Sequence, residues 1–182
     1  MTGRSSGPPA FSIRPTQPSD ATAIDRLYRL VAAPPGGLAR DPDEITSDYI
    51  AAFVRHATTD GLGFLAVPAD SADPSLAGEL HCYPDGPRTF GHVLGNLTVA
   101  VHPAWQGKGV GRALFVALLE EVERNRPGVT RVELVARESN ARAIGLYESL
   151  GFRREGCLEG RVRRPDGVIE ADIPLAWHRS HP

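Results

Sequence analysis

The six residues from Gln106 to Gly111 read Gln-Gly-Lys-Gly-Val-Gly and have the composition of an anion-binding loop. Three alternating glycines between an expected strand and an expected helix leave backbone N–H groups unpaired, with no Cβ atoms in the way. The helix dipole and these free amides favour a phosphate, and Lys108 and Arg112 add positive charge at the rim. The stretch therefore predicts that a phosphate or pyrophosphate binds at a helix start.

Two well-known phosphate-binding loops do not fit this stretch. A Walker loop needs Lys followed by Ser or Thr after its last glycine, whereas Gly111 is followed by Arg112 and Ala113. The dinucleotide fingerprint needs Gly-x-Gly-x-x-Gly after the opening strand of a unit, whereas the spacing here is Gly-x-Gly-x-Gly and earlier strands are expected. For the glycines alone, a tight turn without a ligand remains the alternative.

A third pattern does fit, and it extends beyond the glycines. Gln106, Gly109 and Gly111 fill a signature of Gln or Arg, two residues, Gly, one residue, then Gly or Ala. With Val99 to Pro103 before it and Asn140 to Phe152 after it, the chain resembles the GCN5-related N-acetyltransferase (GNAT) family. The resemblance runs in the family's order along most of the chain. It implies an N-acetyltransferase with acetyl-CoA as cosubstrate and no metal.

The resemblance implies a cofactor cleft between two splayed parallel strands, here His92 to Val101 and Arg131 to Ala136. The first strand would pair with the pantetheine arm, and the glycine loop would wrap the pyrophosphate. An amide beside Val99 would stabilise the thioester oxyanion, which is worth roughly 3 kcal/mol of barrier. The cofactor-binding residues implied in this way are Val99, Ala100, Val101, Gln106, Gly107, Lys108, Gly109, Val110, Gly111, Arg112, Asn140 and Tyr147.

The acceptor amine must lose a proton before it attacks, because a free alkyl amine has a pKa of roughly 10.4. The site therefore needs a base. The candidates are Glu79, His81, His92 and a water molecule held by Asn96. Glu79 is the first choice, since it interrupts an apolar strand expected beside the cofactor strand. The alternative for Glu79 is a solvent-facing strand residue, because alternation predicts one polar face.

The departing CoA thiolate needs a proton, which many members of the family supply from a tyrosine in the second motif. Tyr147 occupies that position and is the expected acid. Its alternative role is a core aromatic beside Ile144 and Leu150, since a buried tyrosine can keep its hydroxyl bonded. Asn140 would cap this helix and face the cofactor at the same time.

The acceptor is expected across the cleft, between the loop from Ala32 to Arg40, the Glu79 strand and the hairpin near Arg164. Four arginines could hold a carboxylate there: Arg40, Arg161, Arg163 and Arg164. A solvated basic strand edge is their alternative role. A small molecule such as an amino acid or amine is the expected acceptor. A protein or peptide acceptor, a non-catalytic acyl-CoA sensor and a structural domain remain alternatives.

In the first half of the chain, polar and apolar patterns predict the elements that must position these residues. Strands are expected at residues 11–14, 63–67, 76–82 and 92–101. One helix should follow Pro18-Ser19-Asp20, and a second should start near Asp41, where Asp41 and Glu44 have capping-box spacing.

In the second half, a helix should follow the glycine loop, and its apolar face runs from Val110 to Val122. A strand at residues 132–136, a helix capped by Asn140 and stopped by Gly151, and two strands around Asp166-Gly167 complete the order. This order predicts a mixed α/β sheet. The resemblance makes that sheet mostly antiparallel, with a central splayed parallel pair flanked by helices.

The 182 residues suit a flexible segment at 1–10 and one N-acetyltransferase domain at 11–182. A net charge of −2 with 41% hydrophobic residues argues against nucleic acid and membrane partners. Cys82 and Cys157 are too far apart for a metal or redox pair and are expected as buried thiols. The start of the chain has no apolar signal core, so a cytoplasmic location is expected. The family resemblance also suggests a homodimer through the C-terminal strands.

Overall fold

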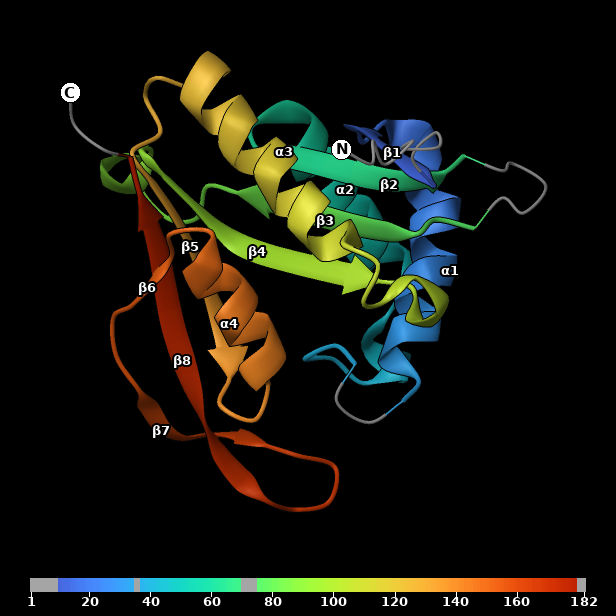
Figure 1. Ribbon diagram of the computed structural model, residues 1–182, viewed down its shortest axis with the longest axis vertical. Coiled ribbons are helices and arrows are strands. Elements are labelled where there is room, and N and C mark those ends of the chain that lie inside the picture. The colour runs from blue at the N-terminus through green and yellow to red at the C-terminus, as the bar shows by residue number, and fades with distance from the viewer. Residues whose placement is uncertain (1–9, 35–36, 70–74, 180–182) are drawn as a thin grey trace, which may run out of the picture.

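The protein, described by a computed structural model over residues 10–34, 37–69 and 75–179, is built on one eight-stranded sheet (Figure 1). The strand order is β1-β2-β3-β4-β5-β8-β6, and β7 pairs with β8. Every pairing is antiparallel except β4 with β5. This confirms the predicted mixed α/β fold. Of the segment predicted to be flexible, residues 1–9 lie outside the described residues.

Strands and helices follow the predicted order. Its first half comprises β1 (Phe11–Pro15), α1 (Ala21–Ala32), α2 (Ser47–Thr59), β2 (Leu62–Pro68), β3 (Gly78–Tyr83) and β4 (Val93–Val101). Its second half comprises α3 (Val110–Asn125), β5 (Arg131–Arg137), α4 (Ala141–Ser149), β6 (Arg153–Arg154), β7 (Leu158–Arg163) and β8 (Ile169–His178). The two-residue β6 was not predicted, because so short a strand carries no periodicity.

The predicted start of the second helix was wrong. The Asp41 and Glu44 capping box exists, but it closes a single 3-10 turn, Pro42–Glu44. The α-helix begins at Ser47, where the side chain of Thr46 accepts a hydrogen bond from Tyr49 N. A capping-box spacing marks a local turn, and an apolar stripe is needed to continue it as a helix.

Two helical layers cover the sheet, with α3 and α4 on one face and α1 and α2 on the other (Figure 1). Alternation in β3 sends Leu80 to the α3 side and Glu79 to the α1 side. Cys82 is buried as predicted, but Cys157 is exposed, because no helix covers the segment between β6 and β7. None of the helices in the described ranges combines the length and hydropathy that crossing a bilayer requires.

The sheet divides at its centre. β4 and β5 pair at only two positions, Val93 with Arg131 and Leu94 with Val132. Beyond Leu94 the strands separate, and in Figure 1 β4 runs toward α1 while β5 runs away beside β8 and α4. The predicted parallel pair is therefore present and opens into a wedge.

Candidate functional site

The open edge of β4 offers backbone groups that have no strand partner. His102 N donates to Ala77 O, so antiparallel alternation assigns Thr98 and Ala100 to the hydrogen-bonded pairs with β3. The amides and carbonyls of Val99 and Val101 consequently point toward the wedge. Within the described residues, the Val101 carbonyl accepts only from the side chain of Gln106, at 3.4 Å.

The facing edge of β5 is open in the same way. Glu138 N donates to Ala171 O and Arg179 N donates to Thr130 O, so even-numbered residues of β5 pair with β8. The backbone groups of Glu133 and Val135 therefore face β4 across the gap. An extended ligand arm inserted here could hydrogen-bond to either strand.

A β-bulge shifts β4 at the narrow end of the wedge. The pairing steps from His81–Thr98 to Tyr83–Gly95, which places one extra residue in β4. Asn96 takes up this residue with a φ of 47°, a left-handed conformation that asparagine tolerates better than most residues. Around Leu97, the bulge therefore interrupts the regular alternation of side chains between the two faces of the sheet.

The glycine loop adopts the conformation that its spacing predicts. Gly107 and Gly109 have φ values of 76° and 85°, and Gly109 is the N-cap of α3. A side chain at Gly109 would meet nothing within 4 Å, so this glycine is required by its backbone angle and keeps the helix start open. A ligand could therefore reach the first amides of α3.

These groups meet at a cavity of about 510 Å³, here named the glycine-loop cavity. It is lined by Val31, Gly37, Val99, Val101, Trp105, Gln106, Gly107, Gly109, Val110, Gly111, Arg112, Phe115, Asn140, Arg142, Ala143, Leu146 and Tyr147. Ten of the twelve predicted cofactor residues are among them. Ala100 is buried on the α1 side, and Lys108 lies over the ring of Trp105 at 5.2 Å.

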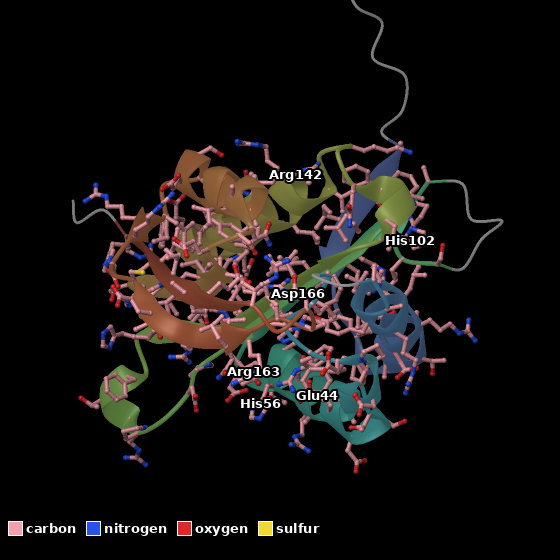
Figure 2. All side chains as sticks on the ribbon, turned by 90° about the horizontal axis from the view of Figure 1, so that it is seen from below. Glu44, His56, His102, Arg142, Arg163 and Asp166 are labelled. Carbon is pink, nitrogen blue, oxygen red and sulfur yellow. The ribbon has the colours of Figure 1, made fainter. Side chains whose placement is uncertain are left out.

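Arg142 is a cation of this cavity that was not predicted. It lies in the first turn of α4, two residues after the cap Asn140 (Figure 2). A Cβ added to Gly107 would lie 3.4 Å from its guanidinium, so Arg142 reaches the glycine loop. The sequence signal that could have identified Arg142 was its position two residues after the capping residue Asn140, which was expected to face the cofactor. Arg112 also lines the cavity and donates to Ser149 Oγ at 2.6 Å.

Tyr147 packs as a core aromatic and also lines the glycine-loop cavity, and its role as the acid stays a prediction. Its ring packs against Phe115 and Phe152, with centroid distances of 5.1 and 6.1 Å. Its hydroxyl has no hydrogen-bond partner among the described residues, although Tyr147 lines the glycine-loop cavity. Burial raises the pKa of Tyr147 to about 12, so the hydroxyl is protonated at neutral pH.

Glu79, the first choice for the base, is fully buried in a side-chain cluster. Tyr28 from α1 donates its hydroxyl to Glu79 Oε2 at 2.6 Å, and His81 Nδ1 lies 3.2 Å from Oε1. Burial, reinforced by the Glu79 carboxylate, raises the pKa of Tyr28 well above its usual value, which keeps that hydroxyl a donor. None of the cavities described here is lined by Glu79, which is 0% exposed.

His81 connects this cluster to a second cavity, here named the histidine cavity, of about 350 Å³. The cavity is lined by Arg40, Tyr49, His81, Tyr83, Asn96, Leu97, Thr98, Arg131, Glu133, Leu134, Val135, Pro174 and Leu175. Phe53 stacks on the imidazole at 3.9 Å between centroids. Asn96 reaches the same cavity, whereas His92 is exposed and does not line it.

A third cavity of about 570 Å³, here named the arginine cavity, lies between the segment after α1 and the β7–β8 hairpin. All four arginines predicted to hold a carboxylate line it, together with Arg137. Figure 2 shows Glu44 and Arg163, which line this cavity from opposite sides. Arg40 lines both this cavity and the histidine cavity.

Comparison with known proteins identifies similar sequences and folds. A model of the acetyltransferase (GNAT) family matches residues 24–152. The ribosomal protein bS18-alanine N-acetyltransferase of Escherichia coli strain K12 is 47% identical over 75 residues, which are 41% of this chain and 49% of that protein. The chain thus matches about half the length of this relative.

Two further proteins extend the comparison. The mycothiol acetyltransferase of Renibacterium salmoninarum is 34% identical over 98 residues, which are 52% of this chain and 27% of that protein. The structure of a GCN5-related N-acetyltransferase from Kribbella flavida superposes with a TM-score of 0.80 and 25% identity, covering 93% of this chain and 98% of that one. The whole described fold therefore has a counterpart among solved acetyltransferase structures.

The buried cluster predicts that Tyr28→Phe is destabilising. The change removes the hydroxyl that donates to Glu79 and leaves a buried carboxylate with one partner fewer. We expect the free energy of unfolding to fall by about 1–3 kcal/mol in urea titration. Tyr83→Phe is the matched control, because the hydroxyl of Tyr83 has no hydrogen bond within the described residues. Equal stabilities of the two variants would contradict the role given to the Tyr28 hydroxyl.

Proposed function

The chain belongs to the GNAT family of acetyltransferases, and from this membership we propose that it transfers an acetyl group from acetyl-CoA to a primary amine. One observation carries the proposal. The glycine loop, the open edge of β4 and the unpartnered hydroxyl of Tyr147 meet in a single cavity of about 510 Å³. This cavity holds donors for a pyrophosphate, for an extended amide arm and for a leaving thiolate.

Each part of acetyl-CoA has a matching group in this chain. The pyrophosphate would bind the first amides of α3, with Arg112 and Arg142 at the rim. The pantetheine arm would pair with Val99 and Val101 along the open edge of β4. The thioester would then lie at the narrow end of the wedge, beside the bulge at Asn96 and the hydroxyl of Tyr147.

The reaction is a direct attack of the amine on the thioester carbonyl. The nitrogen forms a bond to the carbonyl carbon, and backbone amides of β4 stabilise the negative charge that develops on the oxygen. The carbon–sulfur bond then breaks with the electron pair on sulfur. Tyr147 donates its proton to the thiolate, and the nitrogen loses a proton to a base.

We place His81 in the role of base, in preference to Glu79. Glu79 is enclosed by Tyr28 and His81 and lines none of the three cavities, whereas His81 lines the histidine cavity. A carboxylate that accepts from the Tyr28 hydroxyl and from His81 Nδ1–H leaves Nε2 of His81 as the acceptor nitrogen. Glu79 then positions the imidazole, as the buried carboxylate does in a catalytic triad.

The acceptor has two candidate classes. A small amine, such as an amino acid, fits the histidine cavity of about 350 Å³, which is at the lower end of ligand-site volumes. The terminal α-amine of a protein is the second candidate, because one relative is named for alanine acetylation on a ribosomal protein. An acyl-CoA sensor without turnover is disfavoured by the presence of both Tyr147 and His81 at open cavities.

A combined binding and turnover screen tests the proposal. Thiol release from acetyl-CoA is measured against amino acids, polyamines, aminoglycosides and short peptides. We expect turnover with at least one class, and acetyl-CoA at 100 times its Kd should raise Tm by about 5–10 °C. Binding without turnover would indicate the sensor. The absence of any thermal shift would contradict the cofactor site itself.

Tyr147→Phe tests the acid. The ring and its packing against Phe115 remain, so the affinity for acetyl-CoA measured by calorimetry should change by less than about twofold, while kcat falls about 10²-fold or more. Because the pKa of Tyr147 is about 12, its ionisation should not limit the rate below pH 10. Wild-type kcat in this variant would remove Tyr147 from the mechanism.

His81→Ala tests the base against an internal control. We expect kcat/KM to fall about 10²-fold, and added imidazole should restore part of the lost activity by occupying the space beside Glu79. His92→Ala removes an exposed histidine outside the three cavities and should leave the rate unchanged. The assignment fails if His81→Ala keeps the wild-type rate, or if imidazole accelerates both variants equally.

A further inference from the structure

Two cavities on the acceptor side share one lining residue. The histidine cavity contains the proposed base, His81, and the arginine cavity extends toward the β7–β8 hairpin. Arg40 lines both cavities, so the two cavities approach each other at its side chain. An acceptor whose amine lies beside His81 would therefore extend past Arg40 into the arginine cavity.

The carboxylates of the arginine cavity leave part of its positive charge unpaired. The lining contains five arginines, Arg40, Arg137, Arg161, Arg163 and Arg164, and three acidic residues, Asp41, Glu44 and Asp172. Asp41 and Glu44 are used by the capping box, where they accept from backbone amides. Asp172 lies 3.5 Å from Arg161. Arg40 and Arg163 have no carboxylate partner within the described residues.

Arg40 is held in a fixed position relative to His81. Its guanidinium stacks over the ring of Tyr49 at 4.2 Å. Tyr49 packs on Phe53 at 5.3 Å, and Phe53 stacks on His81 at 3.9 Å. This chain of aromatic contacts connects the exposed guanidinium of Arg40 to the proposed base through the partly buried Tyr49 and the buried Phe53.

We propose that the acceptor carries an acidic group and that Arg40 and Arg163 bind this group while the amine lies beside His81. Guanidinium groups bind carboxylates through charge-assisted, often bidentate hydrogen bonds. A basic acceptor would bring like charges together in the same cavity. The inference rests on the proposed acetyl transfer, and it adds a substrate class: an acidic amino acid, or a peptide with Asp or Glu close to its free α-amine.

Matched acceptors test this inference in the full-length enzyme with acetyl-CoA. The probes are free aspartate and glutamate, and tetrapeptides with a free α-amine whose two central residues are aspartate, asparagine or lysine. For the class of acceptor that the enzyme uses, free amino acid or peptide, we expect kcat/KM of the acidic acceptor to be about tenfold above that of its amide counterpart. The difference should come from a lower KM. The ratio should fall as the salt concentration rises from about 0.05 to about 0.5 M.

A pair of arginine variants assigns the effect to the cavity. Arg163→Gln should lower the acidic-to-amide ratio at least threefold, or about 0.7 kcal/mol. Arg153→Gln is the control, because Arg153 is an exposed arginine of β6 that lines none of the three cavities and forms no ion pair among the described residues. Its acidic-to-amide ratio should equal that of wild type. Acetyl-CoA affinity is measured in each variant to show that it is folded.

The outcomes separate the inference from the proposed function. Preference for free aspartate or glutamate supports a small acidic acceptor, and preference for the aspartate tetrapeptide supports an acidic peptide. The inference would be overturned if the aspartate, asparagine and lysine peptides reacted at equal rates and if free aspartate and glutamate reacted no faster than their amide counterparts. Acetyl transfer itself would then remain intact. Acetyl-CoA binding without turnover on any acceptor would refute the proposed function.

Discussion

The separation of β4 from β5 is the constraint on which the candidate site depends. A continuous sheet would satisfy the backbone of both strands and leave no amides for a ligand. Here the two strands pair at Val93 and Leu94 only, and beyond these positions the backbone groups of alternate residues on each inner edge face the wedge. The glycine loop lies at the wide end of this wedge because β4 leads directly into α3. The opening of the sheet and the predicted anion site therefore follow one another along the chain, from β4 through the glycine loop to the start of α3.

Strand alternation distributes the proposed chemistry between the two faces of the sheet. On the α3 side, Val99 and Val101 line the cavity that contains Tyr147. On the α1 side, His81, which contacts the enclosed Glu79, faces a different cavity. The proposed acid and base thus approach the wedge from opposite faces of the sheet. The elements that carry them pack against different helices. Under the proposed function, the cofactor and the acceptor would enter through separate cavities.

The sequence patterns predicted those parts of the site that depend only on neighbouring residues in the chain, such as helix starts and caps. The helix start after the glycine loop and the cap at Asn140 follow from residue type and spacing, whereas the positive φ angles of Gly107 and Gly109 are a finding of the structure. Glu79 was placed on a plausible strand, but its burial depends on Tyr28, which is 51 residues away in sequence. The bulge at Asn96 was also beyond prediction, because one inserted residue changes the phase of β4 without altering its composition. Long-range packing and register are not encoded in periodicity.

The position of β5 has a consequence for the synthesis of the molecule. β8 pairs with β5 along all seven residues of that strand, whereas β4 holds it at two positions. A nascent chain that ends before β8 contains the glycine loop and β4, but it has little to fix the second wall of the wedge. We therefore expect the second wall of the cleft to be fixed only after β8, which ends at His178, has emerged from the ribosome, later than the anion site at the start of α3.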